Sequence, residues 1–369
     1  MTNRWSSACC MLILAMTIAL SGCTAYIPGL SPPVIYPRIV PGEGEFSDLV
    51  STHTFLFGDG QVTITVPVDQ SVYRGAQEAG KTATIYDKDI PDAEWQAGLY
   101  RAMIDDPAQE PFYTAVISAL RTVKTEQNLD SDRYLELLAV FVQSIPYTTV
   151  KANDPKYPIE TFVDGVGDCD DKSMILAGLL AREGYAVALL YFEPENHMAV
   201  GVACPGDSYR DTGYAFLEST GVTLVGVSEG PLDGNVTLES VPLVIPIGNG
   251  TTEYTSCDET QALWNEAELL REKSELLAVD MRERKEELDR RKDELDDLEA
   301  AMDRLHAPGN TREYNRMVPG YNAQARSYNL LLEEYRTIAG EYTDTGERHN
   351  YIITHQHDRQ GTYRTIFGS

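Results

Sequence analysis

The sequence predicts an α+β fold in which helices pack on an antiparallel sheet, followed by a long antiparallel coiled-coil helical hairpin. Two patterns indicate it. Residues 111–218 contain amphipathic helical stretches and then short strand-like runs, and the chain from residue 258 on carries heptads on both sides of a Pro-Gly break. The chain has 369 residues, of which 43% are hydrophobic, and this is enough for one sizeable core and an appendage.

Residues 1–22 have the composition of an export signal. Arg4 precedes the apolar run MLILAMTIAL, which is too short to span a bilayer. The Leu-Ser-Gly-Cys that follows resembles the lipobox of prokaryotic lipoproteins, and this resemblance implies that Cys23 carries a lipid and becomes the mature N-terminus. The alternative is an ordinary signal peptide with an incidental cysteine. In both cases we expect export, and the lipid would anchor the protein in the cell membrane, facing the exterior.

Composition divides the rest of the chain into four segments. Residues 23–45 are rich in proline and glycine and predict an extended tether. Residues 46–257 predict the globular domain, residues 258–345 the helical hairpin and residues 346–369 a polar tail.

The chain is strongly acidic, with 57 acidic and 30 basic residues and a formal net charge of −27. Such a charge makes nucleic acid a poor partner, because the phosphate backbone is bound by basic surfaces. A well-solvated or halophilic surface explains the charge more simply than a specific cationic ligand does.

The first part of the globular domain predicts a β-hairpin over residues 46–75 and then two helices. Alternating apolar residues flank Gly58-Asp59-Gly60 in the hairpin. The helix over residues 111–125 has Pro111 in its first turn, and the helix over residues 131–144 has Ser131 as its expected N-cap.

The stretch GDCDDKSMILAGLL, residues 167–180, places a cysteine at the start of a third helix. Asp168 is the expected N-cap, Asp171 occupies the capping-box position, and Gly184 is expected to end the helix. Backbone N–H groups at a helix start favour a thiolate at Cys169, whereas the neighbouring carboxylates oppose it. A further cation is therefore needed to make this thiol reactive.

Strand-like runs follow this helix at residues 185–192, 197–202 and 214–218, and they predict an antiparallel meander. Residues 243–245 lie between two prolines and predict a short edge strand.

A nucleophilic thiol needs a base, and an imidazole can supply it. The chain has six histidines, and His197 is the candidate because it follows Cys169 by 28 residues, at the start of a predicted strand. A third group should orient the imidazole, and Glu218 lies 21 residues further on, on the neighbouring strand.

Three segments carry a resemblance to a known family: Gly-Asp-Cys-Asp-Asp-Lys-Ser, then Asn-His-Met-Ala-Val, then Phe-Leu-Glu-Ser-Thr. They resemble the motifs of the transglutaminase-like superfamily, over about residues 130–225. The resemblance implies a papain-like core with Cys169 as nucleophile, His197 as base and acid, and Glu218 as the orienting group. The better-known members have Asp at the third position, so Glu218 departs from the pattern.

The reaction expected of this set is attack of the Cys169 thiolate on a peptide or carboxamide carbonyl of a protein or peptide substrate. The acyl-thioester would then be resolved by water or by an amine. The backbone N–H of Cys169 can donate to the oxyanion, and Gln143 is a second candidate donor. We expect no metal and no cofactor, since no calcium-loop pattern occurs and a His355–His357 metal site lacks other nearby ligands. The alternative is a non-catalytic binding or scaffold module that keeps the papain-like groove.

The six cysteines sort by position. Cys9 and Cys10 lie in the signal, Cys23 is the lipid site, and three remain in the body. Any of three pairings is possible by count. We expect a Cys204–Cys257 disulfide, because the catalytic role requires Cys169 to stay free.

The last third predicts two helices that pack side by side. The first heptad runs from Leu263 to Leu305 and is interrupted by Arg284 and Arg291; residues 307–310 then break the helix. The second heptad carries tyrosines seven residues apart: Tyr314, Tyr321, Tyr328, Tyr335 and Tyr342. At full length the first helix would extend about 70 Å, so the hairpin is expected to project from the domain and to offer a surface to a protein partner. The alternative is a helical pair folded flat on the domain, bent at Pro319-Gly320.

Overall fold

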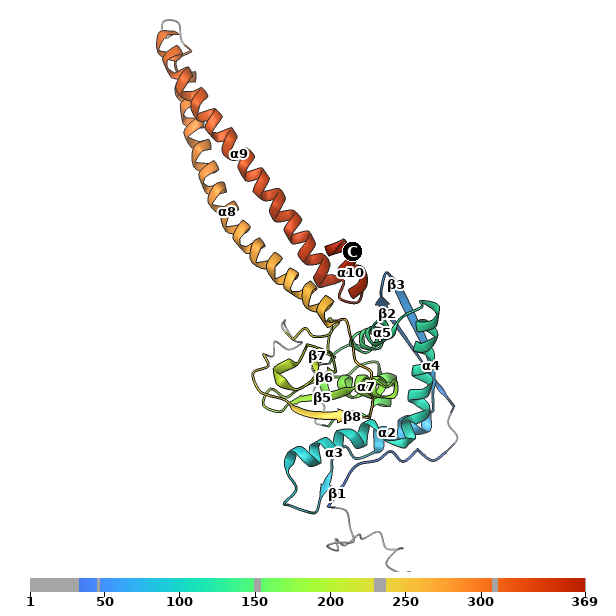
Figure 1. Cartoon of the computed structure of the whole chain (residues 1–369). Helices are drawn as coiled ribbons and strands as arrows, with labels where there is room; N and C mark the ends of the chain where they lie inside the picture. The colour runs from blue at the N-terminus through green and yellow to red at the C-terminus, as the bar shows by residue number, and fades with distance from the viewer. Residues whose placement is uncertain (1–32, 45–46, 149–153, 229–236, 307–310, 369) are drawn as a thin grey trace, which may run out of the picture.

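The computed structural model describes residues 33–44, 47–148, 154–228, 237–306 and 311–368. It shows a mixed α/β body from which a long pair of helices projects (Figure 1). The signal segment, Cys23 and most of the expected tether lie outside the described residues. In the part of the chain that the structure describes, no helix is long and apolar enough to span a membrane.

The expected β-hairpin is confirmed and consists of β2 (Leu49–Phe57) and β3 (Gly60–Val68). Gly58 turns the chain with a φ of 62°, in the left-handed region that favours glycine. One face of the hairpin is buried against two helices, α4 (Glu110–Glu126) and α5 (Ser131–Gln143). Pro111 lies in the first turn of α4 as expected, whereas the N-cap of α5 is Asp130 and not Ser131, because the Asp130 side chain accepts from the Arg133 N–H at 2.8 Å.

The central sheet has the order β7-β6-β5-β8, with every pair antiparallel. Its strands are β5 (Val187–Phe192), β6 (His197–Val202), β7 (Ala215–Leu217) and β8 (Leu243–Ile247). The predicted meander and the predicted edge strand are both confirmed. The helix that carries the cysteine, α7 (Cys169–Arg182), packs across β5 and β6.

Further elements complete the described part of the body. Helix α2 (Gln70–Glu78) and helix α6 (Pro158–Asp164) pack against each other, and the two-residue strands β1 (Val34–Ile35) and β4 (Thr84–Ile85) pair. Helix α3 (Asp92–Ile104) contacts α7 and β8. The sequence patterns did not predict α3, because its apolar residues form no single continuous stripe.

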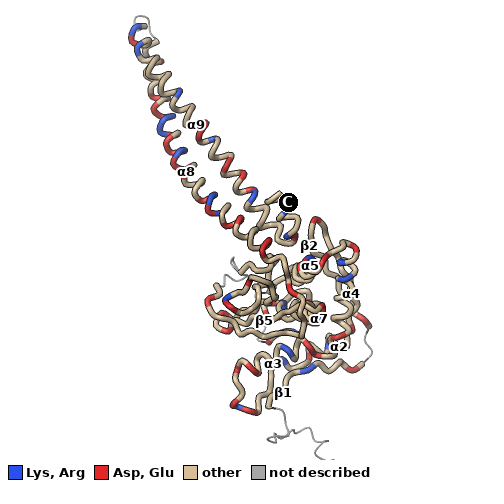
Figure 2. Tube along the Cα trace, in the orientation of Figure 1, with Lys and Arg blue, Asp and Glu red and all other residues tan. Residues whose placement is uncertain are grey.

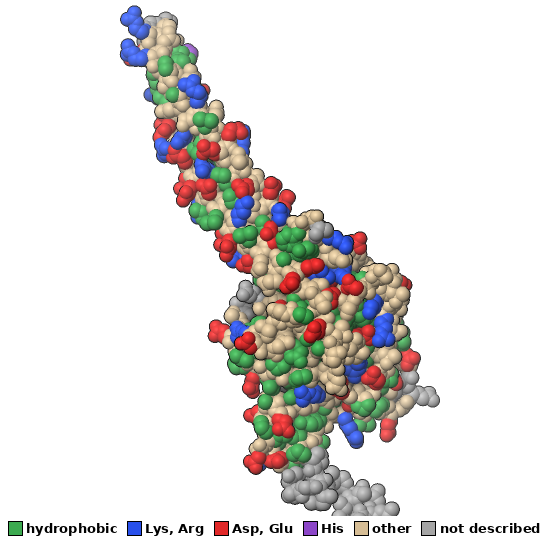
Figure 3. Space-filling model, in the orientation of Figure 1, with side chains coloured by type: hydrophobic (Ala, Val, Ile, Leu, Met, Phe, Trp, Pro, Cys, Tyr) green, Lys and Arg blue, Asp and Glu red, His purple; other side chains and the backbone are tan. Residues whose placement is uncertain are grey.

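The helical hairpin consists of α8 (Cys257–Asp303) and α9 (Thr311–Thr354), which lie side by side and extend away from the body (Figure 1). The flat alternative is therefore wrong, and Pro319 lies inside α9 without ending it. The two arginines that interrupt the first heptad bridge the helices: Arg284 pairs with Glu334 at 2.7 Å, and Arg291 donates to the Ser327 hydroxyl. Charges of both signs alternate along the hairpin (Figures 2 and 3).

Residues 346–369 do not form the expected polar tail. Helix α9 continues through this segment to Thr354, and α10 (Arg359–Phe367) folds back onto the base of α8. The reason is an apolar cluster. The segment is mostly polar, so its few apolar residues do not reveal this cluster in the sequence. Its buried members come from the loop after β7, from α8 and from α9: Leu224, Val227, Leu263, Ala267, Leu270 and Ile352.

A buried ionic cluster joins the hairpin base to the body. Arg359 of α10 contacts Glu136 of α5 at 2.5 Å and also pairs with Glu259 of α8. Glu136 additionally accepts from Arg133 at 3.0 Å and from the Tyr254 hydroxyl at 2.8 Å. The predicted Cys204–Cys257 disulfide is confirmed, and it ties the first residue of α8 to the segment after β6. The base of the hairpin is therefore held both covalently and by charge.

We expect Arg359→Met to lower the free energy of unfolding by about 3 kcal/mol, because the substitution removes one partner from a buried ion pair. Urea denaturation measures this loss. Arg336→Met is the matched control, since Arg336 pairs with Glu333 on the exposed surface of α9 and its removal should cost less than about 1 kcal/mol. Equal losses for the two variants would show that the buried cluster does not hold the hairpin.

Candidate functional site

Cys169 is the first residue of α7, and the expected capping box is confirmed. The Asp168 carboxylate accepts from the Asp171 N–H at 3.5 Å, and the Asp171 carboxylate accepts from the Asp168 N–H at 3.3 Å. Gly184 adopts a φ of 85° just beyond the end of the helix, as the sequence pattern predicts. The thiol of Cys169 is free and partly exposed.

His197 and Glu218 form a buried pair. His197 begins β6, Glu218 follows β7, and the imidazole Nε2 lies 3.0 Å from Glu218 Oε2. The two residues are only 3% and 2% exposed. Glu218 Oε1 accepts from the Ser219 N–H, the Thr220 N–H and the Thr220 hydroxyl at 2.8–2.9 Å. Burial alone would raise the pKa of Glu218, but these bonds and the bond from His197 hold that pKa below its ordinary value.

The thiol of Cys169 lies against the backbone on both sides of His197. Its Sγ is 3.9 Å from the Asn196 carbonyl oxygen, and a hydrogen bond from the Met198 N–H lowers the pKa of the thiol. The Ser173 hydroxyl, one turn further along α7, donates to the Met198 carbonyl at 3.0 Å. The structure therefore brings the helix start that carries Cys169 to the strand start that carries His197.

The electrostatics of the thiol follow the direction that the neighbouring carboxylates predict, and burial adds to their effect. Burial is the largest of the causes that together raise the pKa of Cys169 to about 12. The negative charges of Asp170 and Asp168 also raise this pKa, whereas the Met198 N–H lowers it. The helix start alone does not produce a thiolate here, because desolvation and two adjacent negative charges outweigh the backbone donors. This raised pKa favours the protonated thiol at neutral pH.

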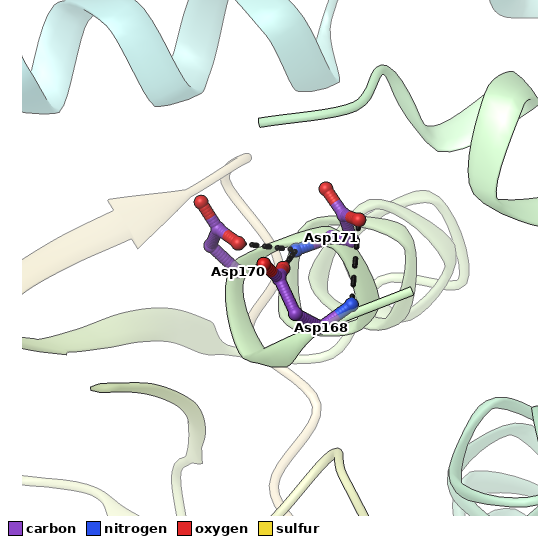
Figure 4. Close-up of side chains that lie close together, drawn as sticks. All are labelled: Asp168, Asp170 and Asp171. Carbon is purple, nitrogen blue, oxygen red and sulfur yellow. Dashed lines mark hydrogen bonds between the residues drawn. The ribbon is translucent and has the colours of Figure 1, made fainter. Parts of the chain in front are cut away.

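Three aspartates surround the start of α7, and their carboxylates lie close together (Figure 4). One ligand oxygen from each of Asp168, Asp170 and Asp171 falls within 4.8 Å of the others, and in the described part of the chain this is the one group of acidic, His or Cys side chains that could hold a metal. Burial and the charge of Asp168 raise the pKa of Asp171 to about 6, and burial also raises the pKa of Asp170. Each aspartate accepts a backbone N–H, from Asp168, Asp171 or Lys156, so helix capping accounts for the cluster.

Gln143 does not serve as an oxyanion donor. It is buried, and its side-chain amide donates to the Glu218 carbonyl at 2.8 Å and to the Thr223 carbonyl at 3.2 Å. Both amide protons are therefore used inside the protein. Gln143 instead holds the backbone of Glu218 in place from the end of α5.

Lys172 belongs to the site although the sequence analysis did not select it. Its ammonium is fully buried and donates to the carbonyls of Gln143, Ile145 and Thr220 at 3.1, 2.6 and 2.8 Å. The sequence signal was a lysine on the apolar side of a helix, one turn before the buried Leu176.

Helix α3 brings aromatic side chains to the same region. The ring of Tyr100 packs 5.8 Å from the ring of Tyr191 on β5. Burial raises the pKa of Tyr100, and the charges of Asp170 and Cys169 add to this rise, so the phenol lies near the thiol. Two surface cavities lie elsewhere, with volumes of about 720 Å³ beside α4 and about 360 Å³ around His53.

Comparison of the chain with protein-family models, with curated proteins and with solved structures gives no match. The arrangement of side chains is therefore the basis for any statement about function.

We expect Asp170→Asn to lower the pKa of Cys169 and to speed its alkylation by iodoacetamide at pH 9 about three- to tenfold, because one adjacent negative charge is removed; tenfold corresponds to one pKa unit. Mass spectrometry of the Cys169 peptide measures the rate. Asp59→Asn, in the exposed turn between β2 and β3, removes the same charge and should leave the rate unchanged. An unchanged rate in Asp170→Asn would contradict the electrostatic account of the thiol.

Proposed function

We propose that the protein is a thiol enzyme of the transglutaminase-like type with a papain-like core, and that it acts on peptide or carboxamide bonds. One observation carries the proposal: a buried His197–Glu218 pair, bonded at 3.0 Å, adjoins a helix-start cysteine. A structural histidine could bond to any backbone group, whereas this one is held by a carboxylate whose other oxygen has three donors of its own. Such a pair fits an imidazole whose orientation matters.

The geometry supports general-base activation of a neutral thiol. Since the resting thiol is protonated, His197 takes the Sγ proton as the sulfur attacks the substrate carbonyl carbon. The imidazolium that forms is stabilised by the Glu218 carboxylate and then gives its proton to the leaving amine. Water, or a second amine, adds to the acyl-thioester and releases the Cys169 thiol. The Cys169 backbone N–H at the start of α7 donates to the oxyanion.

Export and a lipid on Cys23 belong to the same proposal and rest on the sequence pattern of residues 1–23. A lipid-anchored chain with a tether of about twenty residues would keep the domain close to the membrane surface.

A second function is favoured by a specific observation. The raised pKa of the Cys169 thiol and the long projecting hairpin also fit a non-catalytic scaffold that binds a protein partner through α8 and α9. In that case His197 would have no influence on the thiol.

The test is the pH dependence of Cys169 alkylation in the full-length protein and in His197→Ala. At pH 7 we expect Cys169 of the wild type to be alkylated at least tenfold faster than Cys169 of His197→Ala, because the imidazole accepts the thiol proton. The rate of His197→Ala should instead rise about tenfold per pH unit toward alkaline pH, as for a plain thiol of high pKa.

His306→Ala is the matched control, since His306 is exposed at the far end of α8 and should leave the profile unchanged. Identical profiles for the wild type and His197→Ala would remove the basis for the enzyme and favour the scaffold.

A further inference from the structure

We propose that Lys172 is a positioning residue for the His197–Glu218 pair. This inference rests on the proposed function and deepens it. The buried ammonium fixes the turn that presents the Glu218 carboxylate, and so it acts on the thiol through two other side chains rather than by touching the substrate.

Three carbonyl oxygens converge on the Lys172 ammonium from two separate parts of the chain. Gln143 and Ile145 lie at the end of α5 and contribute bonds of 3.1 and 2.6 Å. Thr220, in the turn after β7, contributes a bond of 2.8 Å. An ammonium donates through its N–H groups, and backbone carbonyls are acceptors that suit it. The ammonium thus joins the end of α5 to the turn after β7.

Thr220 is held by Lys172 on one side and holds Glu218 on the other. Its N–H and its hydroxyl donate to Glu218 Oε1 at 2.9 and 2.8 Å, and its carbonyl accepts from Lys172. These donors leave Glu218 Oε2 to face His197. Gln143 bonds the Glu218 carbonyl from the same end of α5. Gln143 and Thr220, which both bond Glu218, are therefore both held by the Lys172 ammonium through their backbone carbonyls.

A lysine is a costly choice for a site with no exposure to water, because burying an ammonium carries a desolvation penalty. An apolar side chain of similar size would avoid that penalty, but it would leave the three carbonyls without their common donor. The end of α5 also carries the negative end of its helix dipole, which favours a cation there. The desolvation penalty of the ammonium is therefore offset by its bonds to the three carbonyls, and these bonds fix the turn that carries Glu218.

A purely structural role for Lys172 makes a different prediction. It would change the free energy of unfolding but leave the chemistry of the folded site intact. The two roles are separated by a readout that folding alone does not change, namely the part of the Cys169 alkylation rate that depends on His197.

The experiment compares Lys172→Met with the wild type in the full-length protein, under conditions where urea denaturation shows both to be folded. Iodoacetamide is the probe, and mass spectrometry follows the Cys169 peptide from pH 6 to pH 10. We expect Lys172→Met to lose at least tenfold in rate at pH 7 and to approach the profile of His197→Ala. Lys81→Met is the matched control, because Lys81 is also largely buried and donates to the Ala76 carbonyl at 2.7 Å.

Lys81→Met should lose stability but keep the wild-type profile. If Lys172→Met does not fold, Thr220→Val serves instead. It removes the hydrogen bond from the Thr220 hydroxyl to Glu218 Oε1 at nearly constant volume, and we expect about a two- to fivefold loss in rate at pH 7. A wild-type profile in folded Lys172→Met, or in Thr220→Val, would overturn the inference while leaving the proposed function intact. A wild type that already behaves like His197→Ala would instead overturn the proposed function.

Discussion

The hydrogen bond between His197 and Glu218 is the constraint on which the site depends. Two polar side chains that are almost fully buried must have all their bonds made inside the protein, since each unmade bond costs about 1–3 kcal/mol. That requirement explains why the turn after β7 donates three times to one carboxylate oxygen, and why Gln143 and Lys172 hold the backbone around it. The sheet order, with β6 beside β7, brings the two side chains together.

The same helix start that places Cys169 also suppresses its ionisation. Asp168 and Asp171 satisfy the N–H groups that begin α7, and the carboxylates of Asp168 and Asp170, together with burial, keep the thiol protonated. The aspartates that stabilise the start of α7 therefore also disfavour the thiolate form of Cys169. In the proposed enzyme, a protonated thiol would depend on its base more strongly than a preformed thiolate would, so the placement of the imidazole would decide its reactivity.

Much of this site was predictable from order and spacing along the chain. A cysteine on a capped helix and polar groups on successive strands identify three of its residues: Cys169, His197 and Glu218. What could not be predicted depends on contacts between distant segments. Gln143 was expected to face the substrate, but its partners lie 75 and 80 residues away, and the position of Lys172 on the apolar side of its helix does not reveal which distant carbonyls surround it. Residues 346–369 are mostly polar, yet the described part of this segment packs on α8 through its few apolar side chains.

In the proposed enzyme, Glu218 holds one ring nitrogen of His197 and leaves the other as a base. Glu218 Oε1 accepts three hydrogen bonds and Oε2 faces Nε2, so we expect Glu218 to be the acceptor and the proton to lie on Nε2. Nitrogen-15 NMR of the histidine-labelled full-length protein, with His197 assigned by comparison with His197→Ala, tests this directly. At a pH where the ring is neutral, we predict a proton on Nε2 and an unprotonated Nδ1. A proton on Nδ1 would contradict the account, because His197 would then have no free lone pair for the thiol.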